Sequence, residues 1–118
     1  MPRPTSSTPS TAAFARAIPS DERAVKRTMF GSPCCFVNGN MFGGVHGHEL
    51  FLRLPEEGRR LLLRRDGASL FEPIHGRPMR EYVCVPSAML DNPRLLRTWV
   101  RRAFEYGLTL APRKPRKL

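Results

Sequence analysis

Two adjacent cysteines could carry thiol chemistry. Cys34 and Cys35 stand side by side, next to a predicted hairpin. A thiol with a lowered pKa would act as a nucleophile or a redox sensor. Neighbouring residues of a strand point to opposite faces, however, and a free cysteine commonly behaves as a small buried hydrophobic residue. We therefore expect both side chains to pack in the core, with redox function as the alternative.

Three histidines offer imidazole nitrogens, which are common zinc ligands. His46 and His48 are two residues apart and could share a face, with His75 or a thiol completing a site. The sequence contains neither a Cys-x-x-Cys pair nor a His-x-x-x-His pair, and solvent-exposed turn histidines are the simpler interpretation. We expect no metal site and no other cofactor.

The serines and glycines form no recognisable reaction site. Ser32, Ser69 and Ser87 lie in no nucleophile-elbow motif, and Gly43-Gly44 is a lone glycine pair rather than a phosphate-binding loop. The sequence contains no recognisable motif that combines a nucleophile, a base and a group that orients the base. The sequence predicts no catalytic residue, no enzymatic activity and no small-molecule substrate.

The remaining candidate functional side chains are mainly arginines. All but three of the 20 basic residues are arginines. Guanidinium groups bind phosphate oxygens in a bidentate manner, which favours nucleic acid as a partner. The candidate contacts lie on one predicted helix and in the C-terminal tail: Arg94, Arg97, Arg101, Arg102, Arg113, Lys114, Arg116 and Lys117. Ordinary solvated helix faces are the alternative explanation.

The charge is concentrated towards the ends of the chain. The formal net charge is +10, yet residues 21–107 carry 14 basic against 10 acidic residues. That mild excess is compatible with an anionic partner without requiring one. Binding of nucleic acid is therefore expected to be weak or mediated by the tail.

Length and composition predict one small globular domain. The chain has 118 residues, of which 41% are hydrophobic. It contains no apolar run of about 18 residues and no apolar stretch typical of a signal peptide. Three cysteines do not form the even, spaced framework of a secreted disulfide-rich protein. We expect a cytoplasmic protein without a membrane partner.

In the first half of the chain, turn residues and alternating apolar residues predict a helix, a hairpin and a further strand. Residues 1–22 are predicted to be a mostly disordered leader with a short helix over Thr11–Ile18. The Asn38-Gly39 pair tolerates positive φ at both positions, which predicts a hairpin with a type I′ turn. A second turn is predicted at His46–His48. The strand that follows it should place one face in the core, formed by Leu50, Leu52 and Leu54.

The second half predicts two helices and a further hairpin. A helix should begin at Pro55 and end near Arg65, burying Leu61–Leu63. Strands at Leu70-Phe71 and Met79–Val85 should be joined by residues 75–78. The last helix should be capped by Asp91 or Asn92, bury Trp99 and Phe104, and end at Gly107. A disordered basic tail is expected over residues 108–118.

The order and spacing of several motifs resemble a known family. These are Met29-Phe30-Gly31, Phe36–Phe42, Leu50–Arg53, Gly76–Met79, Tyr82, Val85-Pro86 and Leu95–Ala103. Together they resemble the N-terminal domain of the TfoX/Sxy family over residues 23–107. The motif residues given a structural role are Met29, Phe30, Gly31, Asn38, Gly39, Met41, Phe42, Gly76, Arg77, Pro78, Met79, Tyr82, Pro86 and Trp99.

The resemblance implies both a fold and a function. It implies an α+β domain with an antiparallel sheet of about five to six strands packed against helices, without the family's C-terminal domain. It also implies a bacterial, non-catalytic module that acts in competence or transcription regulation through a protein partner or self-association. A nucleic-acid-binding accessory that uses its arginine-rich helix faces and basic tail is the alternative.

Overall fold

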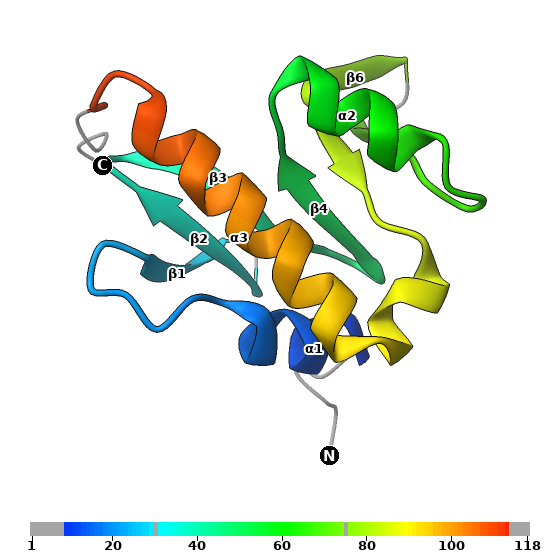
Figure 1. Ribbon diagram of the computed structural model, residues 1–118, viewed down its shortest axis with the longest axis horizontal. Helices are drawn as coiled ribbons and strands as arrows, with labels where there is room; N and C mark the ends of the chain where they lie inside the picture. Colours follow the sequence, from blue (N-terminus) through cyan, green and yellow to red (C-terminus); the bar gives the residue numbers. More distant parts are fainter. Residues whose placement is uncertain (1–8, 30, 75, 114–118) are drawn as a thin grey trace.

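The computed structural model describes residues 9–29, 31–74 and 76–113. It shows an α+β fold whose six strands form one antiparallel sheet in the order β1-β2-β3-β4-β6-β5, which confirms the expected class (Figure 1). The elements in chain order are α1 (Pro9–Ala17), β1 (Val25–Met29), β2 (Ser32–Val37), β3 (Asn40–His46), β4 (Glu49–Arg53), α2 (Glu56–Leu63), β5 (Ser69–Ile74), β6 (Arg77–Cys84), the 3₁₀ helix η2 (Ser87–Asp91) and α3 (Pro93–Thr109).

Positive φ angles mark the tight turns. Asn38 and Gly39 have φ angles of 52° and 78°, which confirms the type I′ pattern predicted between β2 and β3. Gly47, with φ of 63°, opens the turn between β3 and β4. The β5–β6 connection is shorter than predicted, because Arg77 and Pro78 already belong to β6. His75 lies outside the described residues.

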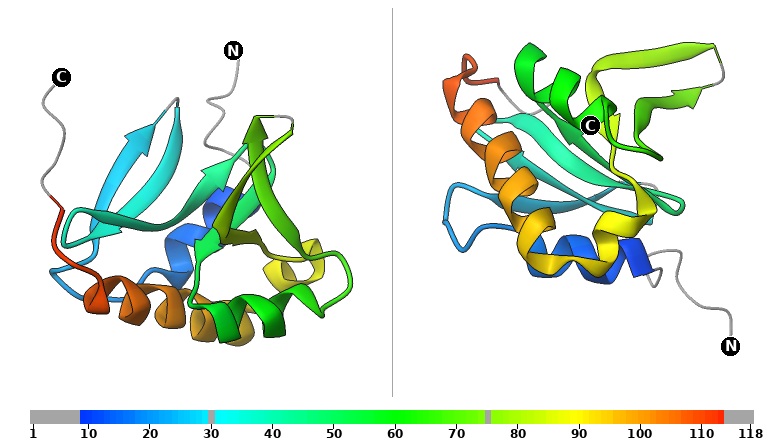
Figure 2. Two further views of the ribbon diagram at one scale, coloured as in Figure 1. Left: turned by 90° about the horizontal axis from the view of Figure 1, so that it is seen from above. Right: turned by 45° about the vertical axis from the view of Figure 1, so that its right-hand side comes forward.

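One face of the sheet packs against helices and forms the main core. Leu50, Leu52 and Leu54 are each at most 1% exposed, as their alternation predicts. Trp99 and Phe104 of α3 join them, and so does Phe14 of α1. Figure 2 shows α3 running along this side of the sheet, while the β1–β2 and β5–β6 hairpins extend away from the helices.

The opposite face carries a second apolar cluster made entirely of strand residues. Phe51 and Phe71 stack with their ring centroids 4.1 Å apart, and Tyr82 meets Phe51 edge-on. Cys84 belongs to the same cluster, and Met41 and Met79 pack against it. The Tyr82 hydroxyl also donates a hydrogen bond to the Met41 carbonyl oxygen, at 3.1 Å. The sheet therefore has apolar side chains on both faces.

The leucines of α2 do not form the buried face that the sequence predicts. Only Leu62 is buried, while Leu61 and Leu63 are 44% and 37% exposed. Consecutive helical residues point about 100° apart, so three in a row cannot share one narrow buried stripe. The helix also ends at Leu63 rather than near Arg65.

Helix α3 begins as predicted but continues further. The Asn92 side chain accepts a hydrogen bond from the Leu95 backbone N–H at 3.2 Å, and Pro93 occupies the first turn. The predicted end at Gly107 is wrong, because the helix runs on to Thr109. Gly107 instead marks a close approach to the sheet, since a Cβ there would overlap the Val37 side chain.

Segments near both ends of the described chain pack onto the sheet. The predicted short helix is present as α1, and its Phe14 side chain has no exposed surface. After α3, the Arg113 backbone N–H donates to the Asn38 carbonyl oxygen at 2.7 Å. The Asn40 amide donates to the Ala111 carbonyl oxygen at 3.0 Å. None of the described helices is long and apolar enough to cross a membrane.

The remaining motif residues fall into three structural groups. Phe42 joins the main core, where its ring meets that of Phe104 edge-on with the ring centroids 5.5 Å apart. Gly31 and Gly76 have φ angles of 78° and 82°, which favour glycine. Met29, Arg77 and Pro78 are exposed, whereas Pro86 is buried just before η2. Phe30 lies outside the described residues.

Candidate interaction surface

Strand β1 forms a regular, open edge of the sheet. It pairs with β2 along all five of its residues, from Val25 opposite Phe36 to Met29 opposite Ser32. All five side chains are exposed. Within the described part of the chain, no strand pairs with its outer side, and the backbone hydrogen bonds outside helices and strands include none to β1. An edge of this kind presents unpaired N–H and C=O groups to a partner.

The other edge strand, β5, is less suited to pairing. Its register with β6 shifts twice, between Leu70 and Phe71 and between Phe71 and Ile74. It also contains Pro73, which has no N–H to donate. Irregular register and proline are common means by which proteins protect a sheet edge. The two edges therefore differ, and of the two β1 is the better suited to pairing.

The side chains of β1 combine positive charge with apolar surface. Lys26 and Arg27 are adjacent, and the strand contains no acidic residue. The Arg27 guanidinium carbon lies 5.8 Å from the centre of the Phe36 ring. Val25 and Met29 are 44% and 43% exposed. An extended acidic segment with apolar side chains would complement this strand in both charge and hydrophobicity.

The candidate nucleic-acid contacts are only partly brought together. Arg94, Arg97 and Arg101 are exposed on α3. Arg102 instead lies over the Trp99 ring, 4.6 Å from its centre, so its guanidinium packs on the helix. Arg113 is exposed and holds the β2–β3 turn through its backbone. The other tail residues, Lys114, Arg116 and Lys117, lie outside the described residues.

The cysteines are buried, as their pattern predicts. Cys35 belongs to the main core, whereas the Cys34 sulfur is 3.5 Å from the Arg27 carbonyl oxygen. Burial raises the pKa of Cys34, and it raises the pKa of Cys35 to about 11. Burial and the nearby Glu49 raise the pKa of Cys84 to about 12. A reactive thiolate needs a lowered pKa, so these thiols are poor nucleophiles.

We expect these thiols to react slowly with a disulfide reagent at pH 8. Raising a pKa by two units leaves about a hundredfold less thiolate at neutral pH. In urea, by contrast, Cys34, Cys35 and Cys84 should all be labelled quickly. Fast stoichiometric labelling of Cys35 or Cys84 in the folded protein, detected by mass spectrometry, would contradict this expectation.

The raised thiol pKa values also predict how the stability of the protein depends on pH. Because the pKa of Cys35 is higher in the folded than in the unfolded protein, the folded state is favoured below pH 9, and the free energy of unfolding should decrease as pH rises from about 9 towards 11.

Two of the three histidines, His46 and His48, lie in the described part of the chain. His46 meets the Phe71 ring edge-on with the ring centroids 5.6 Å apart, and His48 is exposed in the turn. Among residues 9–29, 31–74 and 76–113, no three or more His, Cys, Asp or Glu side chains are grouped to hold a metal ion.

The comparisons with known proteins identify a family. The family model of the TfoX N-terminal domain matches residues 20–106. Neither a curated protein nor a solved structure matches the chain significantly. The matched segment spans the sheet, α2 and most of α3, and it begins after α1. Because it covers well over half of the 118 residues, the chain belongs to the TfoX N-terminal domain family.

Proposed function

We propose that this domain is a non-catalytic regulatory module that binds a protein partner by adding an extended segment of that partner to β1. The observation that carries the proposal is the regular outer edge of a strand that no other described strand pairs with and whose side chains are all exposed. Membership of the TfoX N-terminal domain family supports a regulatory, competence-type role. In this proposal the connection to transcription or competence regulation runs through the bound partner.

When a peptide is added as a strand to a sheet edge, its affinity and its sequence specificity come from different groups. Main-chain hydrogen bonds to the edge supply affinity, and alternate side chains select the sequence that binds. Lys26 and Arg27 favour carboxylates on the incoming strand, while Val25 and Met29 favour apolar side chains. The partner segment is therefore an extended, acidic peptide that contains aliphatic residues.

A second copy of the chain fits the edge less well. Antiparallel pairing of two β1 strands about their middle residue would place Arg27 opposite Arg27. Like charges directly opposite each other destabilise a strand pair. The proposal therefore favours a different, acidic protein over self-association.

Two further observations support a non-catalytic, cytoplasmic module. The buried thiols have raised pKa values, which disfavours nucleophilic chemistry. All three cysteines are free, which is typical of proteins in a reducing compartment. We therefore place the proposed partner in the cytoplasm as well.

The test uses a labelled synthetic peptide of alternating valine and glutamate, with a lysine-for-glutamate peptide as its control. Fluorescence anisotropy should show binding of the acidic peptide only. The K26E/R27E variant should bind about fivefold more weakly, because the glutamates of an alternating peptide lie on one face of the strand and pair with either Lys26 or Arg27, and one exposed ion pair contributes up to about fivefold in affinity. Arg77→Glu, an exposed charge reversal on β6, should leave the affinity unchanged. Equal binding by wild type and K26E/R27E would overturn the proposal.

A second candidate function is nucleic-acid binding, supported by the three exposed arginines of α3. This helix buries Leu96, Trp99 and Val100 against the core, so it is not free to insert deeply into a groove. Contacts would therefore be to phosphates and would weaken steeply with salt. Titration with labelled duplex DNA at near-physiological salt distinguishes nucleic-acid binding from strand addition at β1. Nucleic-acid binding requires that the DNA binds and that charge reversal of Arg97 and Arg101 abolishes this binding.

A further inference from the structure

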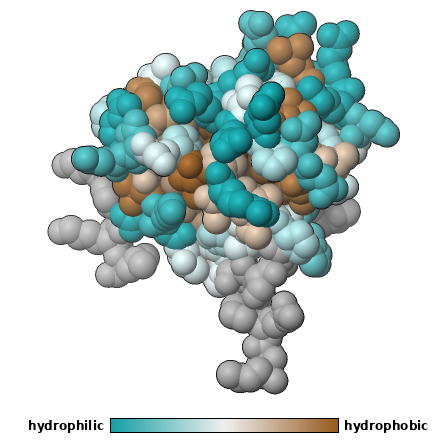
Figure 3. All heavy atoms as spheres, turned by 60° about the horizontal axis from the view of Figure 1, so that its bottom comes forward, coloured by the Kyte–Doolittle hydropathy of each residue, from teal (hydrophilic) through white to brown (hydrophobic). Residues whose placement is uncertain are grey.

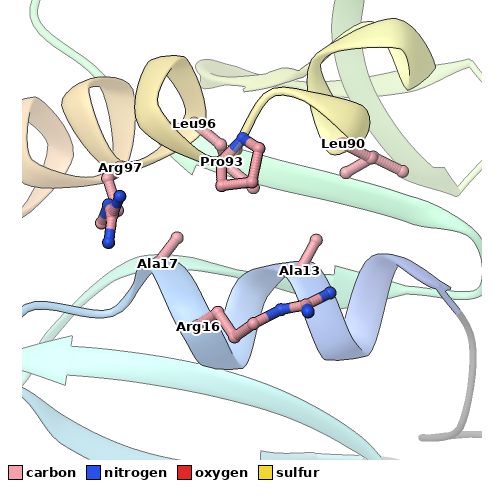
Figure 4. A pocket seen from close by; sticks show the side chains of 7 residues that line it. All are labelled: Ala13, Arg16, Ala17, Leu90, Pro93, Leu96 and Arg97. Atoms are coloured by element: carbon pink, nitrogen blue, oxygen red, sulfur yellow. The ribbon is translucent and has the colours of Figure 1, made fainter.

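A small hollow lies between α1 and the beginning of α3 (Figure 4). Its volume is about 80 Å³, and its lining comes from α1, η2 and α3: Ala13, Arg16, Ala17, Leu90, Pro93, Leu96 and Arg97. Pockets for whole small molecules usually measure about 300–1,000 Å³. This hollow is therefore of a size for one side chain rather than for a metabolite.

The floor of the hollow is aliphatic because of two alanines. Ala13 and Ala17 are one turn apart on α1, so both methyl groups face α3. Both alanines are buried, and Leu96 is buried opposite them. Longer side chains at these two positions would fill the space between the helices. The surface seen from this side of the molecule intersperses hydrophobic patches with hydrophilic side chains (Figure 3).

Two exposed arginines flank the aliphatic floor. Arg97 points from α3 towards α1 beside Ala17, and Arg16 extends along α1 past Ala13 (Figure 4). In the described part of the chain, the ion pairs are Arg23–Asp21 and Arg53–Glu81, so neither of these two guanidiniums is paired with a carboxylate. The hollow therefore combines an apolar floor with two positive groups that can bind an anion.

We propose that this hollow binds an aliphatic side chain of a partner protein that is flanked by carboxylates. The aliphatic group would occupy the space between Ala13, Ala17 and Leu96, and the carboxylates would pair with Arg16 and Arg97. The site shares no residue with the β1 edge and does not depend on strand addition. It gives the domain a second recognition element on the helical side of the sheet.

The lining favours a peptide over nucleic acid. Bases bound by proteins commonly stack on aromatic side chains, and the seven lining residues include none. A phosphate backbone would use the two arginines but would gain nothing from the aliphatic floor. An acidic segment with a leucine, valine or isoleucine uses both features.

The test uses short labelled peptides on the full chain. A Glu-Leu-Glu peptide should bind, and it should shift the NMR amide signals of Ala13, Arg16, Ala17, Leu96 and Arg97. A Glu-Gly-Glu peptide lacks the aliphatic side chain, and a Lys-Leu-Lys peptide lacks the negative charge. Both controls should bind at least about fivefold more weakly, the scale of one lost apolar or ionic contact.

Charge reversal at the rim completes the test. Arg16→Glu and Arg97→Glu should each weaken Glu-Leu-Glu binding about fivefold, since exposed ion pairs contribute on this scale. Arg60→Glu, on α2, is the matched control and should have no effect. Equal affinity for Glu-Gly-Glu, or indifference to Arg16→Glu and Arg97→Glu, would overturn the proposal. So would duplex DNA that binds more tightly than the peptide and shifts the same amides.

The proposals for the β1 edge and for the hollow can be tested independently of each other. The valine–glutamate peptide used for β1 also carries acidic and aliphatic neighbours, so it could occupy the hollow. K26E/R27E removes only its contact with β1, whereas R16E/R97E removes only its contact with the hollow. Amide shifts in residues 25–29 and in residues 13–17 report the two sites separately.

Discussion

Replacing Phe14 with alanine is expected to lower the free energy of unfolding by about 3–5 kcal/mol, the usual cost of truncating a buried phenylalanine. Its side chain has no exposed surface and belongs to the main core. The ring contacts the sheet at Gly43, where a Cβ would lie 3.4 Å from Phe14 Cε1. Removing the ring leaves a cavity between α1 and the sheet. The resulting loss in the free energy of unfolding would be measured by urea unfolding followed by circular dichroism.

The matched control for this substitution is Arg16→Ala on the same helix. Arg16 is exposed, so its truncation should change the free energy of unfolding by less than about 0.5 kcal/mol. A loss below about 1 kcal/mol for Phe14→Ala would contradict the packing of α1 against the core. The result matters because α1 precedes the segment that matches the family.

Gly107→Ala is expected to lower the free energy of unfolding by about 1–3 kcal/mol, the usual cost of overpacking. Alanine is the better helix former by about 1 kcal/mol, so helix propensity alone predicts the opposite sign. The added Cβ would overlap the Val37 side chain, which is fully buried on β2. Steric overlap therefore decides the outcome, as thermal or urea unfolding can show.

A second substitution identifies the cause of that destabilisation. Val37→Ala removes the methyl groups that the new Cβ would meet, although it is destabilising alone because it leaves a cavity. In the Val37→Ala background, Gly107→Ala should cost at least about 1 kcal/mol less than it does in the wild type, a coupling typical of residues in contact. Additive effects of the two substitutions would contradict a direct contact between α3 and β2 at this point.

Local signals in the sequence were sufficient for several elements. The Asn38-Gly39 turn needs positive φ at both positions, a requirement met by two residues alone. The alternation of Leu50, Leu52 and Leu54 predicts a one-sided strand, and the three leucines are buried together. The start of α3 follows from the Asn92 cap and Pro93. Each of these signals depends on interactions within a few residues.

Features set by tertiary packing could not be predicted in this way. Phe51 lies on the face opposite the leucines, and its burial depends on Phe71 and Tyr82 from distant strands. The helical glycine at 107 indicates a helix end by local rules, whereas the close approach of Val37 explains its presence.

The candidate sites also depend on arrangement in space. The exposed edge of β1 follows from the strand order, since only an outermost strand has an unpaired side. The spacing of Arg97 along α3 predicts a contact with phosphate. Its placement near Arg16, across an aliphatic hollow, requires α1 to pack beside α3. Neither spacing nor composition carries that information.

The most direct test of strand addition at β1 is amide hydrogen exchange, measured residue by residue with and without the acidic valine–glutamate peptide. In the free protein, outward-facing amides of residues 25–29 should exchange quickly, because no other described strand pairs with this edge. Saturating peptide should slow the exchange of those amides selectively, and K26E/R27E should abolish the effect. Peptide binding that leaves exchange in residues 25–29 unchanged would contradict the proposed function.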